Sequence, residues 1–401
     1  MRLHPKRLWQ SSSLMTVKNN MQKNLGLYIH IPFCKQKCNY CDFYSLGCNE
    51  NKIPEYIEAL CTHIKREAHL YRNYQIDSIF LGGGTPSLVN EKDFDKLAIT
   101  LRECFNISPT VEFSLEANPG TLTEEKLNCY KKNGVNRLSI GLQSTNDTEL
   151  SVLGRIHNFD EFAKSFNLAR QCGFANINVD IMYGLPDQNL ANLSKTLGDV
   201  CKFSPEHISA YCLKIEENTP FYKIRENLIL PNDDEEYDMY IYLCTELKKQ
   251  GYEQYEISNF SKKASRCVHN LKYWLSEEYI GFGPSAHSFF KGKRYYYENN
   301  LEKYLNSLEC VDNLPKKHYE EDTSLEINST DEYVMLKMRL SDGVNEKEFE
   351  DKFGKSFTDE YPRILSFLKD NYVTYKNGAY AFTEKGFFVS NYILSQILKF
   401  N

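Results

Sequence analysis

The sequence predicts an α/β protein, built on a parallel sheet covered by helices, with a smaller α+β domain at its C-terminal end. Three observations predict this. Apolar segments of strand length alternate six times with helix-length segments between residues 25 and 215, and repeated strand–helix units form parallel sheets. Polar and apolar side chains alternate along several of these strands. From residue 329 onward, closely spaced helices and a hairpin replace that alternation.

The six expected strands define a barrel-like domain over residues 25–215. Phe159, Phe162 and Phe166 share one helical stripe, which is typical of a helix packed on a sheet. Six such units fit an open, three-quarter form of the TIM barrel, whose chemistry lies at the C-terminal ends of its strands. The expected strands are 25–31, 76–81, 111–118, 137–143, 175–183 and 207–213, and the expected helices are 54–71, 91–104, 123–132, 159–171 and 189–201.

The alternation within the strands predicts a polar lumen. In the strand 111–118, for example, every second residue is apolar and the residues between them are polar. Because helices cover the apolar faces, the polar faces line the inside of the barrel, with Glu116, Gln143 and Asp180 near the C-terminal ends of their strands. Buried polar groups without partners are costly, so we expect a polar occupant.

Residues 216–328 form an extension of the barrel domain, with a helix over 232–250 and a strand over 252–260. Residues 329–401 are expected to form a winged-helix-like domain. Its hairpin has Asn377-Gly378 at the turn, a strong hairpin signal. The domain shows no basic stripe, so packing against the barrel mouth is favoured over DNA binding. Its expected elements are helices 331–339, 345–353 and 359–370, the hairpin 372–382, and a helix from Lys385.

Composition narrows the class of protein. The net charge of −6 argues against nucleic acid as a partner. No apolar run approaches the ~18 residues of a membrane span, and no secretory signal is visible. The 13 cysteines show no disulfide framework, which predicts the reducing cytoplasm. Residues 1–24 are basic and lack acidic residues; they indicate a flexible leader rather than a targeting peptide, because no Arg-rich amphipathic pattern is present.

The most informative stretch follows the first expected strand. Cys34, Cys38 and Cys41 are spaced CxxxCxxC, and three close thiolates can bind three irons of a [4Fe–4S] cluster, leaving the fourth iron open to a reactive ligand. A zinc site is the competing metal site, but no second cysteine pair or histidine pair follows at zinc-site spacing. Three ordinary buried thiols are the remaining alternative.

The segment from Tyr28 to Ser45 resembles the signature of radical S-adenosylmethionine (SAM) enzymes. In detail it resembles the branch that contains oxygen-independent coproporphyrinogen III oxidases and the heme chaperones HemW. The resemblance implies a partial (β/α)6 barrel of the radical SAM type. It also implies that SAM chelates the open iron, and that an electron donor such as flavodoxin or ferredoxin reduces the cluster so that SAM is cleaved to a 5′-deoxyadenosyl radical.

The same resemblance implies which residues contact SAM. Tyr28 matches a tyrosine beside SAM. Gly83, Gly84 and Thr85 belong to a Gly-Gly-Gly-Thr-Pro run directly after a strand; glycines allow the backbone to approach a ligand closely, and in the family this run contacts the SAM amino group. The remaining polar positions that match SAM-binding residues are Glu116, Gln143, Arg155 and Asp180.

A second segment, 266–274, predicts a heme contact. If the segment is helical, His269 and Tyr273 lie on one face, and both residue types ligate heme iron in proteins. The segment matches HNxxYW, a motif of the heme-chaperone branch, and residues 281–287 also resemble a shared family pattern. The oxidases carry one more cysteine where this chain has Phe43, which favours the chaperone branch.

Three functions therefore stay open. The favoured hypothesis is a heme-binding radical SAM protein that delivers heme to acceptor proteins, with peripheral contact to membrane heme proteins. The alternative is an oxygen-independent coproporphyrinogen III oxidase, which decarboxylates coproporphyrinogen III to protoporphyrinogen IX. The third is a plain iron–sulfur or zinc protein. The sequence does not indicate the acceptor, the oligomeric state or whether SAM is turned over.

Overall fold

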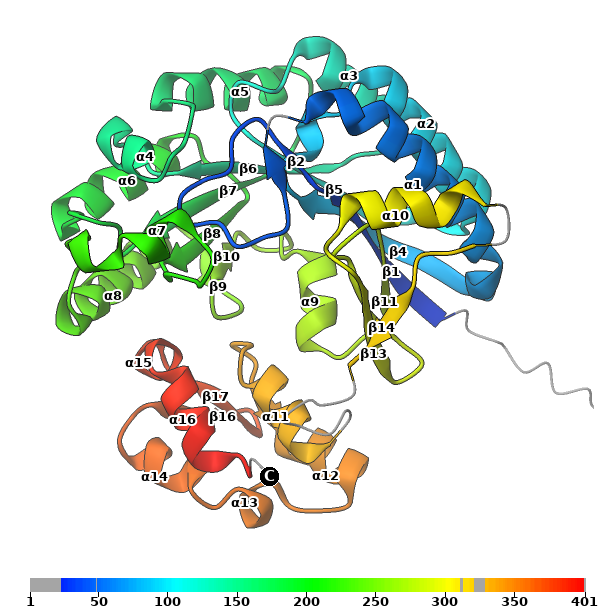
Figure 1. The fold of residues 1–401 in the computed structure, drawn as a ribbon. Helices are drawn as coiled ribbons and strands as arrows, with labels where there is room; N and C mark the ends of the chain where they lie inside the picture. Colours follow the sequence, from blue (N-terminus) through cyan, green and yellow to red (C-terminus); the bar gives the residue numbers. More distant parts are fainter. Residues whose placement is uncertain (1–22, 48, 311–312, 321–328, 400–401) are drawn as a thin grey trace, which may run out of the picture.

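The structure is a computed structural model that describes residues 23–47, 49–310, 313–320 and 329–399. It is built on one 12-stranded sheet, which is curved like an arch with helices along its outer side (Figure 1). Seven neighbouring strands of this sheet are parallel. They are, in spatial order, β11 (Tyr279–Phe282), β1 (Lys23–Ile31), β4 (Tyr74–Gly83), β5 (Ile107–Ala117), β6 (Arg137–Gln143), β7 (Asn176–Tyr183) and β8 (His207–Cys212).

All six strands expected from the sequence are present, and the predicted partial barrel with a C-terminal domain is confirmed. The first strand begins at Lys23, so the last two residues of the expected leader belong to the sheet. Residues 1–22 lie outside the described residues. The outer helices are α1 (Ile53–Glu67), α2 (Glu91–Cys104), α3 (Glu124–Lys132), α5 (Phe159–Gln171), α6 (Leu190–Lys202) and α8 (Asp233–Lys249), with the shorter α4 (Asp147–Val152) and α7 (Pro220–Lys223) between them.

Side-chain caps explain where the outer helices begin. Before every outer helix except α1, an Asn or Thr accepts a hydrogen bond from a backbone N–H of the first turn, which satisfies a donor that has no partner within the helix. In α5 and α8, a glutamate in the third helical position also accepts from the cap's own backbone N–H. The capping residues are Asn90, Thr123, Asn146, Asn158, Asn189, Thr219 and Asn232.

The parallel core is extended by antiparallel strands at both edges. The expected strand 252–260 is in fact two short strands, β9 (Glu253–Gln254) and β10 (Asn259–Ser261), which follow β8. At the other edge, β12 (His287–Phe290), β13 (Lys293–Tyr297) and β14 (Lys317–Tyr319) continue the sheet beyond β11. A short helix, α10 (Leu301–Glu309), packs against α1.

Helix α9 (Val268–Trp274) lies on the inner side of the arch (Figure 1). It packs close to the first half of β1, because a Cβ atom on Gly26 would lie 2.9 Å from Lys272 Cδ and 3.2 Å from His269 Cε1. The cysteine loop begins at the other end of β1, where β2 (Phe33–Cys34) pairs with β3 (Leu46–Gly47). Helix α9 therefore fills the end of the lumen opposite the cysteines.

The C-terminal domain combines helices with a three-stranded sheet. At its hairpin turn, Asn377 and Gly378 both have positive φ angles (53° and 77°), as a tight hairpin turn requires. The expected helix 359–370 is divided at Pro362. The elements are α11 (Thr330–Lys337), β15 (Val344–Asn345), α12 (Glu346–Phe353), α13 (Phe357–Glu360), α14 (Ile364–Lys369), β16 (Val373–Lys376), β17 (Ala379–Phe382), α15 (Glu384–Phe388) and α16 (Ser390–Ile397).

The C-terminal domain is joined to the barrel by backbone pairing. The Ile257 N–H donates to the Arg339 carbonyl (3.0 Å), and the Ser341 N–H donates to the Tyr255 carbonyl (3.0 Å). A β-bridge links Glu256 with Leu340 between these two bonds. Among the helices that the described residues form, none combines the length and the apolar character of a membrane span.

Candidate functional site

The loop that carries the three cysteines is fixed by hydrogen bonds to segments far away in the sequence. The N–H of Asn39 donates to the carbonyl of Leu153 (2.9 Å), and its side-chain amide donates to that of Val152 (2.9 Å). The carbonyl oxygen of Asn39 accepts from the N–H of Phe221 (2.9 Å). The loop is therefore held at its centre by the segments after β6 and β8.

The three thiols lie half-buried on this loop. The hydroxyl of Thr85 donates to Cys34 Sγ (3.5 Å), and Arg155 Nη1 donates to Cys38 Sγ (3.6 Å). Burial raises the pKa of Cys41 to about 11, and the charges of Cys38 and Cys34 act in the same direction. In the described part of the chain, no three His, Cys, Asp or Glu side chains meet around one ion position. A cubane does not require such a meeting point, because each cysteine binds a different iron.

The glycine run joins the cysteine loop to the sheet. Gly83 has φ +107°, and a Cβ there would lie 2.4 Å from His30 Cε1. A Cβ on Gly84 would lie 2.6 Å from the carbonyl oxygen of Phe33, to which the N–H of Thr85 donates (2.7 Å). Gly83 therefore requires glycine because its backbone is left-handed and lies against the His30 ring, and Gly84 requires it because its backbone lies against that of the cysteine loop.

Glu116 lies at the C-terminal end of β5 and faces the glycine run. Its Oε2 accepts a hydrogen bond from the N–H of Gly83 (3.0 Å). By exposed area Glu116 is half-buried. Burial raises its pKa to about 8, and the charge of Asp180 contributes to that shift. Burial likewise raises the pKa of Asp180.

Asp180 is held in place by a polar network across β6, β7 and β8. Asn178 Nδ2 donates to Asp180 Oδ1 (2.7 Å) and to Ser139 Oγ (2.7 Å), and Ser139 donates to Asp180 Oδ2 (3.2 Å). His207 Nδ1 and Ser209 Oγ donate to Asn178 Oδ1 (2.6 and 3.1 Å). The lumen is therefore lined by polar groups, as the alternation predicts.

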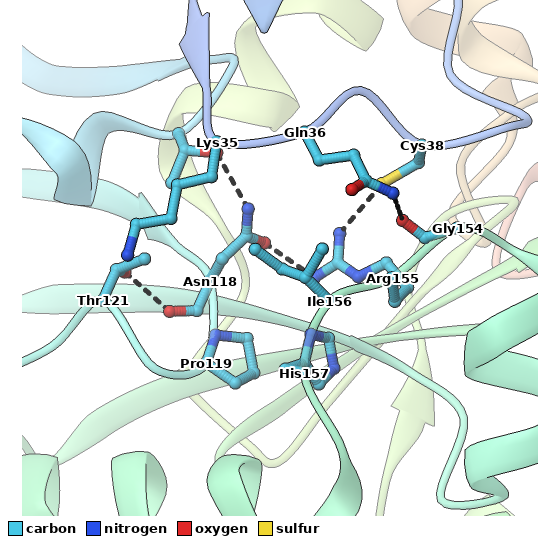
Figure 2. Close-up of a pocket in the computed structure, with 11 residues that line it drawn as sticks. Lys35, Gln36, Cys38, Asn118, Pro119, Thr121, Gly154, Arg155, Ile156 and His157 are labelled. Atoms are coloured by element: carbon cyan, nitrogen blue, oxygen red, sulfur yellow. Dashed lines mark hydrogen bonds between the residues drawn. The ribbon is translucent and has the colours of Figure 1, made fainter. Parts of the chain in front are cut away.

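Arg155 links the lumen wall to the cysteine loop (Figure 2). Its Nη2 donates to Asn118 Oδ1 (2.7 Å) and to the carbonyl of Gly141 (2.5 Å), while Nη1 reaches Cys38. Gln143 lies close by, after a bulge in β6, and has φ +71°. A positive φ at a non-glycine residue is a strained conformation of the kind found at ligand sites.

Tyr28 and His30 line the β1 side of the lumen. The Tyr28 hydroxyl donates to His30 Nδ1 (3.0 Å), and His30 Nε2 donates to the carbonyl of Tyr44 (2.9 Å). Burial raises the pKa of Tyr28 and lowers that of His30 to about 4. Both ring nitrogens of His30 are used, so this histidine orients Tyr28 and the cysteine loop.

These residues fit the groups that the sequence predicts. Within the described residues, Arg155 Nε is buried without a hydrogen-bond partner, which leaves a donor for an anionic ligand group such as a carboxylate. Glu116 and Asp180 offer carboxylates to cationic groups, and Gly83 brings the backbone against them. SAM carries a carboxylate, an ammonium and a sulfonium, so its charges match these partners.

The predicted heme ligands lie elsewhere. His269 is fully buried in α9. Its Nδ1 is hydrogen-bonded to Ser78 Oγ (2.9 Å), and its Nε2 to the hydroxyl of Tyr273 (3.0 Å). Its ring also stacks on Phe80, with a centroid distance of 5.4 Å. A bond from His269 or Tyr273 to heme iron would replace the hydrogen bond between them, so their role as heme ligands stays a prediction.

Sequence reasoning did not find several residues that hold the site together. Asn39, Asn118 and Asn178 each make two or more hydrogen bonds within the site, but an isolated asparagine in a loop or strand carries no pattern. Asn118 and Asn178 belong to the polar faces that the alternation places in the lumen. That alternation was the signal for them.

A partial parallel barrel with a three-cysteine loop at its mouth and a polar lumen defines a radical SAM protein. Residues 28–200 match the model of the Radical SAM superfamily, and residues 330–389 match the HemN C-terminal domain. The structure is similar to coproporphyrinogen III oxidase (HemN) from Escherichia coli, with a TM-score of 0.79 over 94% of this chain and 91% of that chain. Sequence identity is 22%, so this likeness shows the fold alone.

The curated relatives give the finer assignment. The chain is 34% identical to heme chaperone HemW of Bacillus subtilis over 92% of its length and 98% of that protein. It is 35% identical to heme chaperone HemW of Haemophilus influenzae over 93% of its length and 98% of that protein. The chain belongs to the HemW family of radical SAM proteins.

Proposed function

We propose that this chain is a radical SAM protein that binds heme and delivers it to heme-accepting proteins. One observation carries the proposal: relatives named heme chaperone HemW match the chain over almost their whole length at 34–35% identity. The replacement of the oxidases' further cysteine by Phe43 supports the same conclusion. Phe43 is 67% exposed beside Cys41, so this position presents an apolar ring instead of a thiol.

In this proposal Cys34, Cys38 and Cys41 hold the [4Fe–4S] cluster. The donors on Cys34 and Cys38 support the assignment, because hydrogen bonds to sulfur help set the reduction potential of such clusters. A bound cluster supplies one-electron chemistry to SAM at its open iron. The residues proposed to bind SAM are Tyr28, Gly83, Gly84, Thr85, Glu116, Gln143, Arg155 and Asp180.

The chain's own groups have distinct roles around SAM. Arg155 binds the carboxylate through Nε, the donor for which the described part of the chain offers no partner. Glu116 is hydrogen-bonded to the N–H of Gly83 and faces the ammonium and sulfonium of SAM. Its carboxyl loses its proton when SAM binds. The wall of the lumen made by the Asn178 network excludes water from below the ligand.

The proposed partners are a heme-accepting protein and an electron donor of the flavodoxin or ferredoxin class. Because the cluster thiolates must stay reduced, we infer a cytoplasmic location. Delivery to a respiratory heme protein would require peripheral contact with a membrane. The half-buried loop of Cys34, Cys38 and Cys41 leaves the cluster accessible to such a donor.

The experiment that tests the function uses the full-length protein, reconstituted anaerobically with iron and sulfide. We expect added heme to give a Soret band and to pass to an apo-heme protein, while coproporphyrinogen III stays unchanged. Catalytic decarboxylation of coproporphyrinogen III would overturn the proposal in favour of the oxidase. A Cys38→Ser variant should lose the cluster spectrum, and a variant that keeps it would refute the ligand assignment.

A further inference from the structure

The histidines of this chain differ sharply in how accessible their imidazoles are. Within the described residues, five histidines are buried, and each has at least one ring nitrogen in a hydrogen bond: His30, His63, His157, His207 and His269. The exposed or half-exposed ones are His69, His287 and His318. His69 lies on the outer side, after α1, where its Nδ1 bonds the Arg66 carbonyl (2.9 Å).

His287 and His318 are neighbours in one row of aromatic rings. The row crosses three adjacent strands, because His287 of β12 pairs with Tyr296 of β13, and Tyr296 pairs with His318 of β14. The rings stack, with centroid distances of 5.2 Å between His287 and Tyr296 and 5.4 Å between Tyr296 and His318. Side chains stand upright on a sheet, so the row presents ring edges to the solvent.

This row belongs to the inner face of the arch. Tyr28 of the lumen wall pairs with Gly281 of β11, and the register of β11 with β12 places His287 opposite Gly281. Gly281 has no side chain, so nothing on β11 stands between Tyr28 and His287. The charge of His287 also contributes, after burial, to the lowered pKa of His30, which agrees with this placement.

The row also lies beside the HNxxYW helix. Tyr273 of α9 contacts Tyr279 of β11, with a centroid distance of 4.6 Å. Tyr279 is two residues before Gly281 on the same face of the strand. The HNxxYW motif in α9 therefore lies beside the aromatic row, but its own histidine, His269, is buried.

The surroundings of His287 are those of a metal-binding imidazole. Its side chain is 57% exposed, and its Nδ1 lies 3.6 Å from Glu320 Oε1. A carboxylate beside one ring nitrogen orients the imidazole and leaves the other nitrogen for a metal. Lys316, exposed and two residues before His318 on the same face, offers a cation to a carboxylate at the sheet edge.

We propose that His287 is the axial ligand of the heme iron, with the macrocycle lying over the row His287–Tyr296–His318 on the inner face of β12–β14. This inference rests on the proposed function. The heme would contact ring edges of Tyr296 and His318, and Lys316 would meet a propionate. His269 would instead support this surface from below, through Tyr273 and Tyr279.

The test is heme titration of the full-length, cluster-reconstituted protein under anaerobic conditions, followed by the Soret maximum and by the electron paramagnetic resonance spectrum of the ferric form. We expect His287→Ala to change both spectra and to weaken heme binding at least about tenfold. Added imidazole should restore the spectra, because it replaces the missing ligand. His69→Ala, an exposed histidine on the outer side, is the matched control and should behave as wild type.

The outcomes separate the inference from the function on which it rests. Wild-type protein that binds no heme would refute the proposed function. Wild-type protein that binds heme, together with an unchanged spectrum in His287→Ala, would overturn the assignment of His287 alone. Loss of the spectrum in a folded Tyr273→Phe or His269→Ala variant, but not in His287→Ala, would assign the ligand to α9. Loss in His318→Ala alone would assign it to His318.

Discussion

Glu116 is the residue whose charge state the lumen controls most directly. Its pKa of about 8 means that the carboxyl of the ligand-free protein is mostly protonated at pH 7. A cationic ligand favours the carboxylate, so binding below pH 8 must release a proton. We predict that SAM affinity rises with pH, by up to about tenfold per pH unit, and levels off above pH 8. Calorimetry in buffers of different ionisation enthalpy measures the released proton.

The control for this prediction is Glu116→Gln, which should bind SAM more weakly at pH 8.5 and lose the pH dependence. The folding stability of the ligand-free protein depends on pH in the opposite direction to SAM affinity. A carboxyl with a raised pKa contributes its stability at low pH and loses it as the pH rises through the folded pKa. Glu116→Gln should therefore raise the Tm of the ligand-free protein at pH 9. An equal pH slope in both proteins would contradict the role of Glu116.

A substitution at Gly83 tests whether this position needs glycine for its left-handed backbone and its close contact with the His30 ring. In Gly83→Ala the new Cβ would meet the His30 ring at 2.4 Å in a left-handed backbone conformation. We expect a loss of about 2–3 kcal/mol of unfolding free energy, measured by denaturant unfolding. Gly198→Ala in α6 is the control: a Cβ there has no neighbour within 4 Å, so it should stabilise by about 0.5–1 kcal/mol.

At the residue scale, the sequence indicated the residues that bind a cluster or ligand better than the residues that hold them in position. Cys34, Cys38 and Cys41 stand out because the CxxxCxxC spacing by itself suits the binding of an iron–sulfur cluster. The polar faces that carry Glu116 and Asp180 stand out because alternation is local. The hydrogen bond between Arg155 and Asn118 and the register that places Tyr28 beside Gly281 depend on pairings between distant segments. No local pattern encodes those pairings, so they became visible only in the structure.

At the scale of elements, helix α9 depends on a carboxylate from the sheet. Glu112 of β5 accepts hydrogen bonds from the N–H groups of Val268 (2.9 Å) and His269 (3.0 Å) at the start of the helix. It replaces the side-chain cap that Cys267 does not supply. We predict that Glu112→Ala costs about 1–2 kcal/mol of unfolding free energy and speeds amide exchange in 268–274. Exchange there that stays as slow as in wild type would contradict this capping role.

The matched control is Glu103→Ala, an exposed glutamate near the end of α2. It should change the unfolding free energy by less than about 0.5 kcal/mol and leave exchange in α9 unchanged.

The six long strands could be predicted because each carries enough residues to show its period, and glycines or caps mark its ends. The strands β11 to β14 could not, and the predicted strand 252–260 is divided into β9 and β10. They are two to five residues long, and β13 is a tyrosine run without alternation. The expected helix 359–370 failed for a different reason: proline has no N–H and disfavours helix at the preceding residue, so the chain divides at Pro362 into α13 and α14.

At the scale of the whole molecule, the barrel and the C-terminal domain meet at Glu256, which is 1% exposed. It accepts a hydrogen bond from the N–H of Ser258 (3.1 Å), and burial raises its pKa to about 7. Its contribution to stability is therefore complete below about pH 4.5 and is lost as the pH rises through 7. We predict that wild-type Tm falls between pH 6 and pH 8.5, by an amount equivalent to about 1 kcal/mol.

Scanning calorimetry at both pH values measures this effect, with Glu256→Gln as the comparison. The amide keeps hydrogen-bonding atoms without a charge, so the variant should lose most of the difference and be the more stable protein at pH 8.5. A variant that keeps the full pH dependence would show that another group at the interface is responsible. Arg339, whose side chain contacts Ser390 and Asn391 of α16, would be the next residue to test.

Among the described residues the sheet does not close on itself, and its two edge strands are β9 and β14. Unpaired strand edges can recruit another chain by continuing the hydrogen-bond ladder. Here β9 has two residues, Glu253 and Gln254, and β14 has three, with a lysine at its start. Although Tyr319 of β14 is 50% exposed, edges this short give an incoming strand few hydrogen bonds, so the arch can stay open without promoting aggregation.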